Sequence, residues 1–169
     1  MRKIIFITGG QRSGKSSYAQ RLAEKFSANP VYLATARHWD DDFEARIRRH
    51  QADRGEMWTT LEEEKALSRH NLSGKTVLLD CITLWLTNIF HDNGYQLNRA
   101  LEEAKAEWAR FINQDFTLIV VSNEIGMALH APDEVSRHFT DLQGWMNQHI
   151  AQSADKVFIT ISGIPKRLK

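Results

Sequence analysis

The sequence predicts an α/β fold in which a mostly parallel sheet is flanked by helices. Two observations support this prediction. Short apolar runs rich in β-branched residues, which are typical of buried strands, alternate with longer segments whose apolar residues recur at helical spacing. A glycine-rich loop also joins the first apolar run to the first helical segment. Because parallel strands need crossover connections, we expect helices on both faces of the sheet.

The elements of the first half follow from these patterns. Apolar or β-branched runs place the expected strands at residues 3–7, 30–35, 57–61 and 75–80. The expected helical segments lie at residues 18–26, 40–54, 62–70 and 82–90. The helix at 40–54 begins with three aspartates, which suit the positive end of a helix dipole, and it ends at Gly55.

In the second half, strands are expected at residues 116–121 and 156–161. Apolar stripes at helical spacing predict long helices over residues 97–111 and 135–150. In parallel sheets, ligands bind at the carboxyl ends of the strands. The residues expected at those ends are Gly9, Thr35, Asp80 and Asn123.

The composition indicates a single domain that spans residues 1–169. The chain is 42% hydrophobic and 25% charged, and it contains no repeat, low-complexity tract or Pro/Gly-rich linker. A net charge of +1 gives no global field that favours nucleic acid or a membrane surface. No apolar run approaches the roughly 18 residues of a membrane-spanning helix. The one cysteine, Cys81, excludes an internal disulfide framework and suits a reducing compartment, so we expect a cytoplasmic protein.

The glycine-rich loop fits the pattern G-x-x-x-x-G-K-[ST], which is the phosphate-binding loop of nucleoside-triphosphate enzymes. Its glycines let successive backbone N–H groups point into one anion-sized hollow. Lys15 supplies a positive charge for the β- and γ-phosphates, and the Ser16 hydroxyl can bind Mg²⁺. The loop therefore predicts a P-loop NTPase-like fold that binds a nucleoside triphosphate. Its residues are Gly9, Gly10, Gln11, Arg12, Ser13, Gly14, Lys15 and Ser16.

Asp80 ends an expected strand and is the candidate second element of the phosphate site. An acid at a strand tip holds Mg²⁺ directly or through water in such enzymes, because Mg²⁺ prefers hard oxygen ligands. Arg46, His50 and Arg54 are spaced by four on the helix expected at 40–54 and so form one column. Such a column suits a polyphosphate and disfavours protonation of His50, leaving a nucleophilic imidazole. A solvated basic face that contains a histidine by chance is the alternative explanation.

Taken together, the motifs of the chain resemble those of the bifunctional adenosylcobinamide kinase / adenosylcobinamide-phosphate guanylyltransferase family of cobalamin assembly. The similarity extends over almost the whole chain. The motifs are the loop 9–16, Ala34-Thr35-Ala36, Arg46-Ile47-x-x-His50, Trp58-x-Thr60-x-Glu62, Leu79-Asp80-Cys81-Ile82-Thr83-Leu84-Trp85, Asn123-Glu124-Ile125-Gly126 and Ser162-Gly163-Ile164-Pro165.

The resemblance implies two reactions on one nucleotide site. In the first, ATP or GTP gives its γ-phosphate to the hydroxyl of adenosylcobinamide. In the second, a histidine, here His50, attacks the α-phosphorus of GTP, and adenosylcobinamide phosphate then takes up the GMP to give adenosylcobinamide-GDP. Lys15 would act in both reactions, and a homo-oligomer, specifically a trimer, is expected. The nucleotide-binding residues implied beside the loop are Ala34, Thr35, Ala36, Gln51, Ala52, Asp53, Arg54 and Glu62.

Two other function classes are weighed against this one. A single-activity small-molecule kinase explains Lys15, Ser16 and Asp80 but leaves the column of Arg46, His50 and Arg54 without a role. A GTP-dependent switch is disfavoured, because the chain has no Asn-Lys-x-Asp motif for reading guanine. Labelling of the protein by α-labelled GTP distinguishes the bifunctional enzyme from the single-activity kinase.

Overall fold

The computed structural model describes residues 1–37, 55 and 57–169. In this part of the chain, a seven-stranded sheet has the order β3-β2-β4-β5-β1-β6-β7. All of its pairings are parallel except that of β7 with β6. The strands are β1 (Lys3–Gly9), β2 (Val31–Ala34), β3 (Thr59–Glu62), β4 (Thr76–Asp80), β5 (Thr117–Val121), β6 (Lys156–Ile161) and β7 (Ile164–Arg167).

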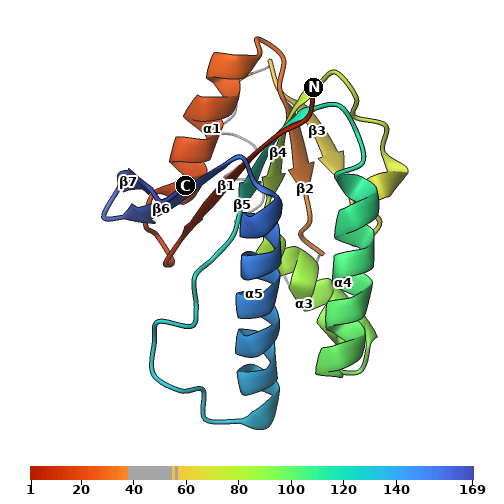
Figure 1. Cartoon of the computed structure of the whole chain (residues 1–169), viewed down its shortest axis with the longest axis vertical. Helices are drawn as coiled ribbons and strands as arrows, with labels where there is room; N and C mark the ends of the chain where they lie inside the picture. Colours follow the sequence, from red (N-terminus) through yellow and green to blue (C-terminus); the bar gives the residue numbers. More distant parts are fainter. Residues whose placement is uncertain (38–54, 56) are drawn as a thin grey trace.

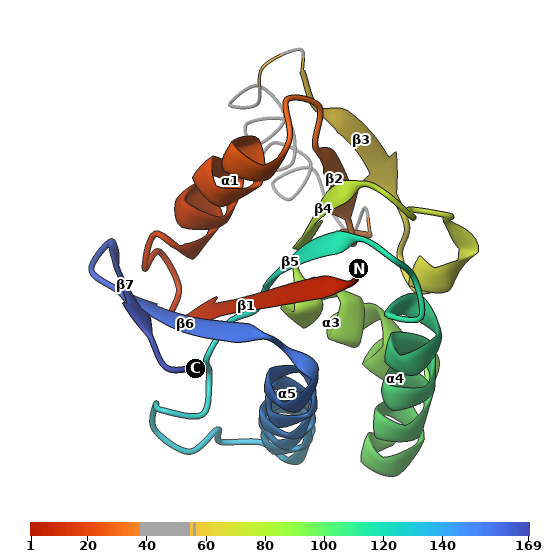
Figure 2. The same cartoon turned by 45° about the horizontal axis from the view of Figure 1, so that its top comes forward.

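Helices cover both faces of the sheet, as the alternation of patterns predicted. Helix α1 lies on one face, and α3, α4 and α5 lie on the other (Figures 1 and 2). The helices are α1 (Lys15–Phe26), α3 (Ile82–Asp92), α4 (Leu97–Phe111) and α5 (Glu134–Ser153). The α/β fold with a mostly parallel sheet is therefore confirmed. No helix of the described residues is long and apolar enough to cross a membrane.

The central strands send alternate side chains to the two faces. Ile4 and Phe6 of β1 pack with buried residues of α3, α4 and α5, whereas Ile5 and Ile7 pack on the α1 side against Ala19 and Ala23. Side chains of a strand alternate with a period of two, so a strand buried on both faces reads as a continuous apolar run. This burial holds the carboxyl ends of the strands in one row, where the candidate site lies.

The prediction of a short helix at residues 62–70 is wrong. Glu62 is the last residue of β3, and the segment contains only a 3₁₀ turn, η1 (Leu67–Arg69). The Glu63 carboxylate accepts hydrogen bonds from the backbone N–H groups of Lys65 and Ala66. Side-chain hydrogen bonds of this kind offer the backbone an alternative to a helix.

Strand β7 was not predicted. It forms a hairpin with β6 through Ser162 and Gly163, which both have positive φ values, 50° and 81°. Positive φ at both central residues is typical of a two-residue hairpin turn. The helix predicted at 40–54 lies outside the described residues, which end at Arg37 and resume at Gly55 and Met57.

Candidate active site

The phosphate-binding loop lies between the end of β1 and the start of α1. Within the loop, the Lys15 ammonium donates a hydrogen bond to the Gly10 carbonyl at 2.8 Å. The β6–β7 hairpin supports the loop from the side. The hydroxyls of Ser13 and Thr160 share a hydrogen bond at 2.8 Å, and the Gly163 N–H donates to the Ser13 carbonyl at 2.9 Å. The loop predicted at residues 9–16 is therefore held in place by two neighbouring strands and a helix.

Two glycines of the loop are required by its surroundings. Gly9 has φ = 156°, and a Cβ built on it would lie 2.6 Å from the Thr160 carbonyl oxygen. Gly14 has φ = 91°, and its Cβ would lie 3.0 Å from the Cα of Gly163. In contrast, a Cβ on Gly10 would meet no atom within 4 Å. The tight fit is thus confined to the points where the loop touches β6 and the hairpin turn.

Replacing Gly9 with alanine is expected to lower the free energy of unfolding by about 1–3 kcal/mol, because the new methyl group overpacks against backbone atoms of β6. Nucleotide affinity should fall with it, since the loop must shift. Thermal unfolding and nucleotide titration measure the two effects. Gly10→Ala is the matched control and should leave the melting temperature unchanged. Equal losses in the two variants would contradict the assignment of the tight fit to Gly9.

Lys15 and Asp80 are brought together although their strands are not neighbours. The Lys15 side chain is buried, and burial lowers the pKa of its ammonium, an effect opposed by the negative charge of Asp80. Strand β5 lies between β1 and β4 in the sheet. The loop and the acid therefore meet at the carboxyl edge across one intervening strand, as expected for the two elements of one phosphate site.

Neighbouring side chains fix the position of Asp80. The Tyr32 hydroxyl donates a hydrogen bond to the Asp80 carboxylate at 3.0 Å. Directly after β2, the Thr35 hydroxyl donates to the Cys81 carbonyl at 2.8 Å and accepts from the Cys81 N–H at 3.0 Å. Burial raises the pKa of the Cys81 thiol to about 12, so the thiol stays protonated at neutral pH and is no nucleophile.

Asn123, which follows β5, takes part in a polar network that the sequence interpretation did not anticipate. Its N–H and its side-chain amide both donate to the Thr83 hydroxyl at 3.1 Å. The Asn147 amide donates to the Asn123 carbonyl, and the Gln143 amide donates to the side chains of Asn147 and Ser122. A signal was present in the sequence, since Gln143 and Asn147 interrupt the apolar stripe of α5 at a spacing of four.

The structure gathers part of the predicted site. The loop 9–16, Thr35, Asp80 and Asn123 lie at the carboxyl edge of β1, β2, β4 and β5. Glu62 also ends a strand, but β3 is at the edge of the sheet, with β2, β4 and β5 between it and β1. Ala34 and Ala36 flank Thr35 and are half-buried. The remaining predicted residues lie outside the described part of the chain: Arg46, His50, Gln51, Ala52, Asp53 and Arg54.

Comparison with known proteins points to one family. Residues 5–168 match the family described as cobinamide kinase / cobinamide phosphate guanyltransferase. The chain is 39% identical over 167 residues to the bifunctional adenosylcobalamin biosynthesis protein CobP of Pseudomonas aeruginosa, with 96% of this chain and 95% of that protein covered. It is 33% identical over 181 residues to the bifunctional adenosylcobalamin biosynthesis protein CobU of Escherichia coli, with 98% and 99% covered.

Among solved structures, the flagellar accessory protein FlaH of Methanocaldococcus jannaschii aligns with a TM-score of 0.46 and 14% identity. The alignment covers 99% of this chain and 78% of FlaH.

Proposed function

The chain belongs to the cobinamide kinase / cobinamide phosphate guanyltransferase family, and we propose that its single nucleotide site serves both reactions of that name. It is an enzyme of cobalamin biosynthesis. The observation that supports this function most directly is the family match over residues 5–168 on a chain whose phosphate-binding loop is intact at residues 9–16. We further propose that residues 1–169 act as one catalytic domain.

In the first reaction, the hydroxyl oxygen of adenosylcobinamide attacks the γ-phosphorus of ATP or GTP. The bond to the γ-phosphorus forms as the bond to the β-phosphate oxygen breaks, the hydroxyl proton passes to water, and a nucleoside diphosphate leaves. This transfer depends mainly on positioning and on neutralisation of charge. Lys15 supplies a cation by exchanging its hydrogen bond to the Gly10 carbonyl for phosphate oxygens. The backbone N–H groups of the loop and the N-terminus of α1 receive the phosphates.

Ser16 and Asp80 fit the requirements of a Mg²⁺ site. A hydroxyl and a carboxylate are hard oxygen donors, and neither residue is fully buried. Ser16 and Asp80 would hold the ion, which would supply positive charge to neutralise the triphosphate. The hydrogen bond from Tyr32 orients the Asp80 carboxylate, which would bind the metal either directly or through water.

In the second reaction, His50 attacks the α-phosphorus of GTP. The new N–P bond forms as the bond to the β-phosphate oxygen breaks, and pyrophosphate leaves. A phosphate oxygen of adenosylcobinamide phosphate then attacks the same phosphorus, His50 leaves, and adenosylcobinamide-GDP results. The spacing of Arg46, His50 and Arg54 in the sequence supports this role, because flanking cations favour a neutral imidazole and neutralise the phosphates.

The rest of the nucleotide is proposed to contact residues that follow β2, the residue that ends β3, and residues 51–54 of the sequence, which lie outside the described part of the chain. These contacts are assigned to Ala34, Thr35, Ala36, Gln51, Ala52, Asp53, Arg54 and Glu62. The exposed Glu62 carboxylate can accept hydrogen bonds from ribose hydroxyls or from a guanine edge.

Replacing Asp80 with asparagine should lower both activities by about 100-fold, because a charged ligand of the metal is lost while the shape is kept. Half-saturation by Mg²⁺ should move to a higher concentration, which a Mg²⁺ titration of each reaction measures. Tyr32→Phe is the matched control, since it removes the hydrogen bond but keeps the carboxylate, and its effect should be smaller. An Asp80→Asn protein with an unchanged Mg²⁺ requirement would rule out the metal role.

A homo-oligomer, specifically a trimer in the cytoplasm, is also proposed. Exposed apolar side chains on and beside the β6–β7 hairpin support self-association, because such groups favour burial at an interface: Ile161, Ile164 and Leu168. Sedimentation equilibrium measures the mass in solution, and a monomer at micromolar concentration would contradict this part of the proposal.

The decisive experiment incubates the protein with Mg²⁺, α-labelled GTP and adenosylcobinamide. We expect adenosylcobinamide phosphate, an acid-labile GMP adduct on the protein and then adenosylcobinamide-GDP, each identified by mass spectrometry. Phosphorylation of adenosylcobinamide without any GMP adduct would favour the single-activity kinase. Absence of all three products would overturn the proposal.

A further inference from the structure

A pocket of about 560 Å³ lies between α3, α5 and the segment that follows β5, and we call it the α3–α5 pocket. It is separate from the phosphate-binding loop, which contributes no residue to it. Its walls are mainly apolar and aromatic, with a few hydroxyl groups and the imidazole of His91. Residues that define it include Thr87 and Phe90 of α3, Ile125 of the segment after β5, and Val135, Phe139 and Thr140 of α5.

Two connections join the α3–α5 pocket to the phosphate site. Helix α3 begins directly after Asp80 and Cys81. The Thr87 hydroxyl donates to the Thr83 carbonyl, and the Thr83 hydroxyl accepts from the Asn123 N–H. At a rise of 1.5 Å per residue, the pocket wall at Thr87 begins roughly 10 Å from Asp80. The segment after β5 also touches both places, because the Glu124 N–H donates to the Gly9 carbonyl and Ile125 lines the pocket.

The chemistry of the walls is unsuited to a second nucleoside triphosphate and favours a large, weakly charged ligand. No lysine, arginine, aspartate or glutamate is among the residues that line the pocket in the described part of the chain. The rings of Phe90 and Phe139 lie 5.7 Å apart, and the Tyr95 ring is 5.5 Å from Phe90. Aromatic surfaces with a few hydroxyls suit a ligand that is apolar at its centre and carries hydrogen-bonding groups at its rim.

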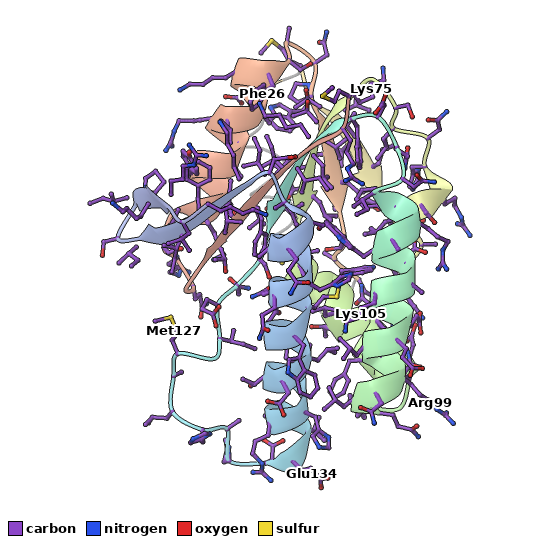
Figure 3. The ribbon with its side chains drawn as sticks, in the orientation of Figure 1. Phe26, Lys75, Arg99, Lys105, Met127 and Glu134 are labelled. Atoms are coloured by element: carbon purple, nitrogen blue, oxygen red, sulfur yellow. The ribbon has the colours of Figure 1, made fainter. Side chains whose placement is uncertain are left out.

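The segment between β5 and α5, which contributes Ile125 to the pocket, also carries exposed apolar side chains. Met127 and Leu129 are 82% and 97% exposed, although both are large and apolar. Figure 3 shows Met127 on this segment between the end of β1 and the start of α5 at Glu134. An unbranched, polarisable methionine adapts to the surface of a ligand.

We propose that the α3–α5 pocket receives an edge of the corrin ring of adenosylcobinamide. This inference rests on the proposed function, which requires an acceptor with an apolar macrocycle, methyl and amide substituents, and an arm that ends in the reacting hydroxyl. The ring edge packs against Phe90, Val135 and Phe139, and amide groups meet the hydroxyls of Thr87 and Thr140. The arm then runs along the start of α3 toward the γ-phosphate held beside Lys15 and Asp80.

The test places a charge or a bulky ring in the pocket without disturbing the core. Val135 is suitable because its side chain is exposed and lies in the first turn of α5, where an acid is compatible with the helix dipole. Val135→Glu adds a charge to the apolar wall, and Val135→Trp fills the pocket without a charge. Trp145→Glu makes an apolar-to-acid change further along the same helix, outside this pocket.

We expect both Val135 variants to raise the KM for adenosylcobinamide by about tenfold or more, because a charge or a clash replaces apolar contact. Their KM for GTP and their labelling by α-labelled GTP alone should match those of the wild type, as should all parameters of Trp145→Glu. If Val135→Glu lowers the melting temperature, Val135→Trp decides the result. An unchanged KM for adenosylcobinamide in the folded variants would overturn the pocket assignment alone. A wild-type protein that does not turn over adenosylcobinamide would instead overturn the proposed function.

Discussion

Replacing Lys15 with methionine should lower both the kinase and the guanylylation rates by about 1,000-fold, since loss of one preorganised charge at a reacting phosphate has this order of effect. The ammonium already lies at the phosphate-binding loop, where it donates to the Gly10 carbonyl at 2.8 Å. Attack on the γ-phosphorus and attack on the α-phosphorus both place negative charge on the same triphosphate. A cation that serves the whole triphosphate must therefore act in both reactions.

The fold should tolerate the Lys15→Met change. Burial disfavours the charged ammonium, as the lowered pKa of Lys15 indicates, and methionine fills a similar space without that cost. We expect a melting temperature equal to or slightly above that of the wild type. Steady-state assays of each half-reaction and a thermal melt provide the measurements. Lys25→Met, on the exposed last turn of the same helix, is the matched control. A Lys15→Met protein that loses only one activity would show that the two reactions do not share this cation.

The central strands and long helices could be predicted because burial determines their pattern. Strand β1 lies inside the sheet with a helix layer on each face, so its run of apolar residues predicts a buried strand. The same holds for the stripe of α4, which buries Ala104, Trp108 and Phe111. For such elements, local pattern and tertiary environment agree.

The elements at the margins of the sheet were harder to predict because local hydrogen bonds and turn geometry decide them. The carboxylate of Glu63 accepts hydrogen bonds from backbone N–H groups and so favours a non-helical conformation at 62–70. The spacing of apolar residues in the sequence gives no sign of these hydrogen bonds. Strand β7 depends on the turn at Ser162 and Gly163, and its side chains are exposed, so it carries no apolar signature. Its absence from the sequence-based prediction follows from that exposure.

The candidate site divides in the same way. Lys15 and Asp80 could be predicted because each belongs to a short motif with a fixed place at a strand end. The hydrogen bonds of Thr35 to Cys81 and of Asn123 to Thr83 join segments that are distant in sequence, so spacing alone could not reveal them. The α3–α5 pocket also arises from packing between separate elements. The sequence alone therefore could not identify the part of the site that binds the acceptor substrate.

Replacing His50 with alanine should abolish the protein-bound GMP and reduce formation of adenosylcobinamide-GDP to background, while the kinase reaction keeps at least about a third of its rate. The expectation follows from the chemistry of the two transfers. The guanylyl transfer passes through a bond to the histidine nitrogen, so without that nitrogen the two-step route is closed. The kinase transfer goes directly to the corrinoid hydroxyl and needs charge neutralisation but no protein nucleophile.

Intact-protein mass spectrometry after incubation with GTP and Mg²⁺ detects the adduct, and the phosphorylation of adenosylcobinamide is assayed in parallel. His149→Ala, on α5 and outside the phosphate site, is the matched control and should label as fully as the wild type. Labelling of the His50→Ala protein at the wild-type level would assign the nucleophile to another residue. An equal fall of both activities in that protein would mean that His50 acts on the triphosphate in both reactions, and the division of labour between Lys15 and His50 would then be wrong.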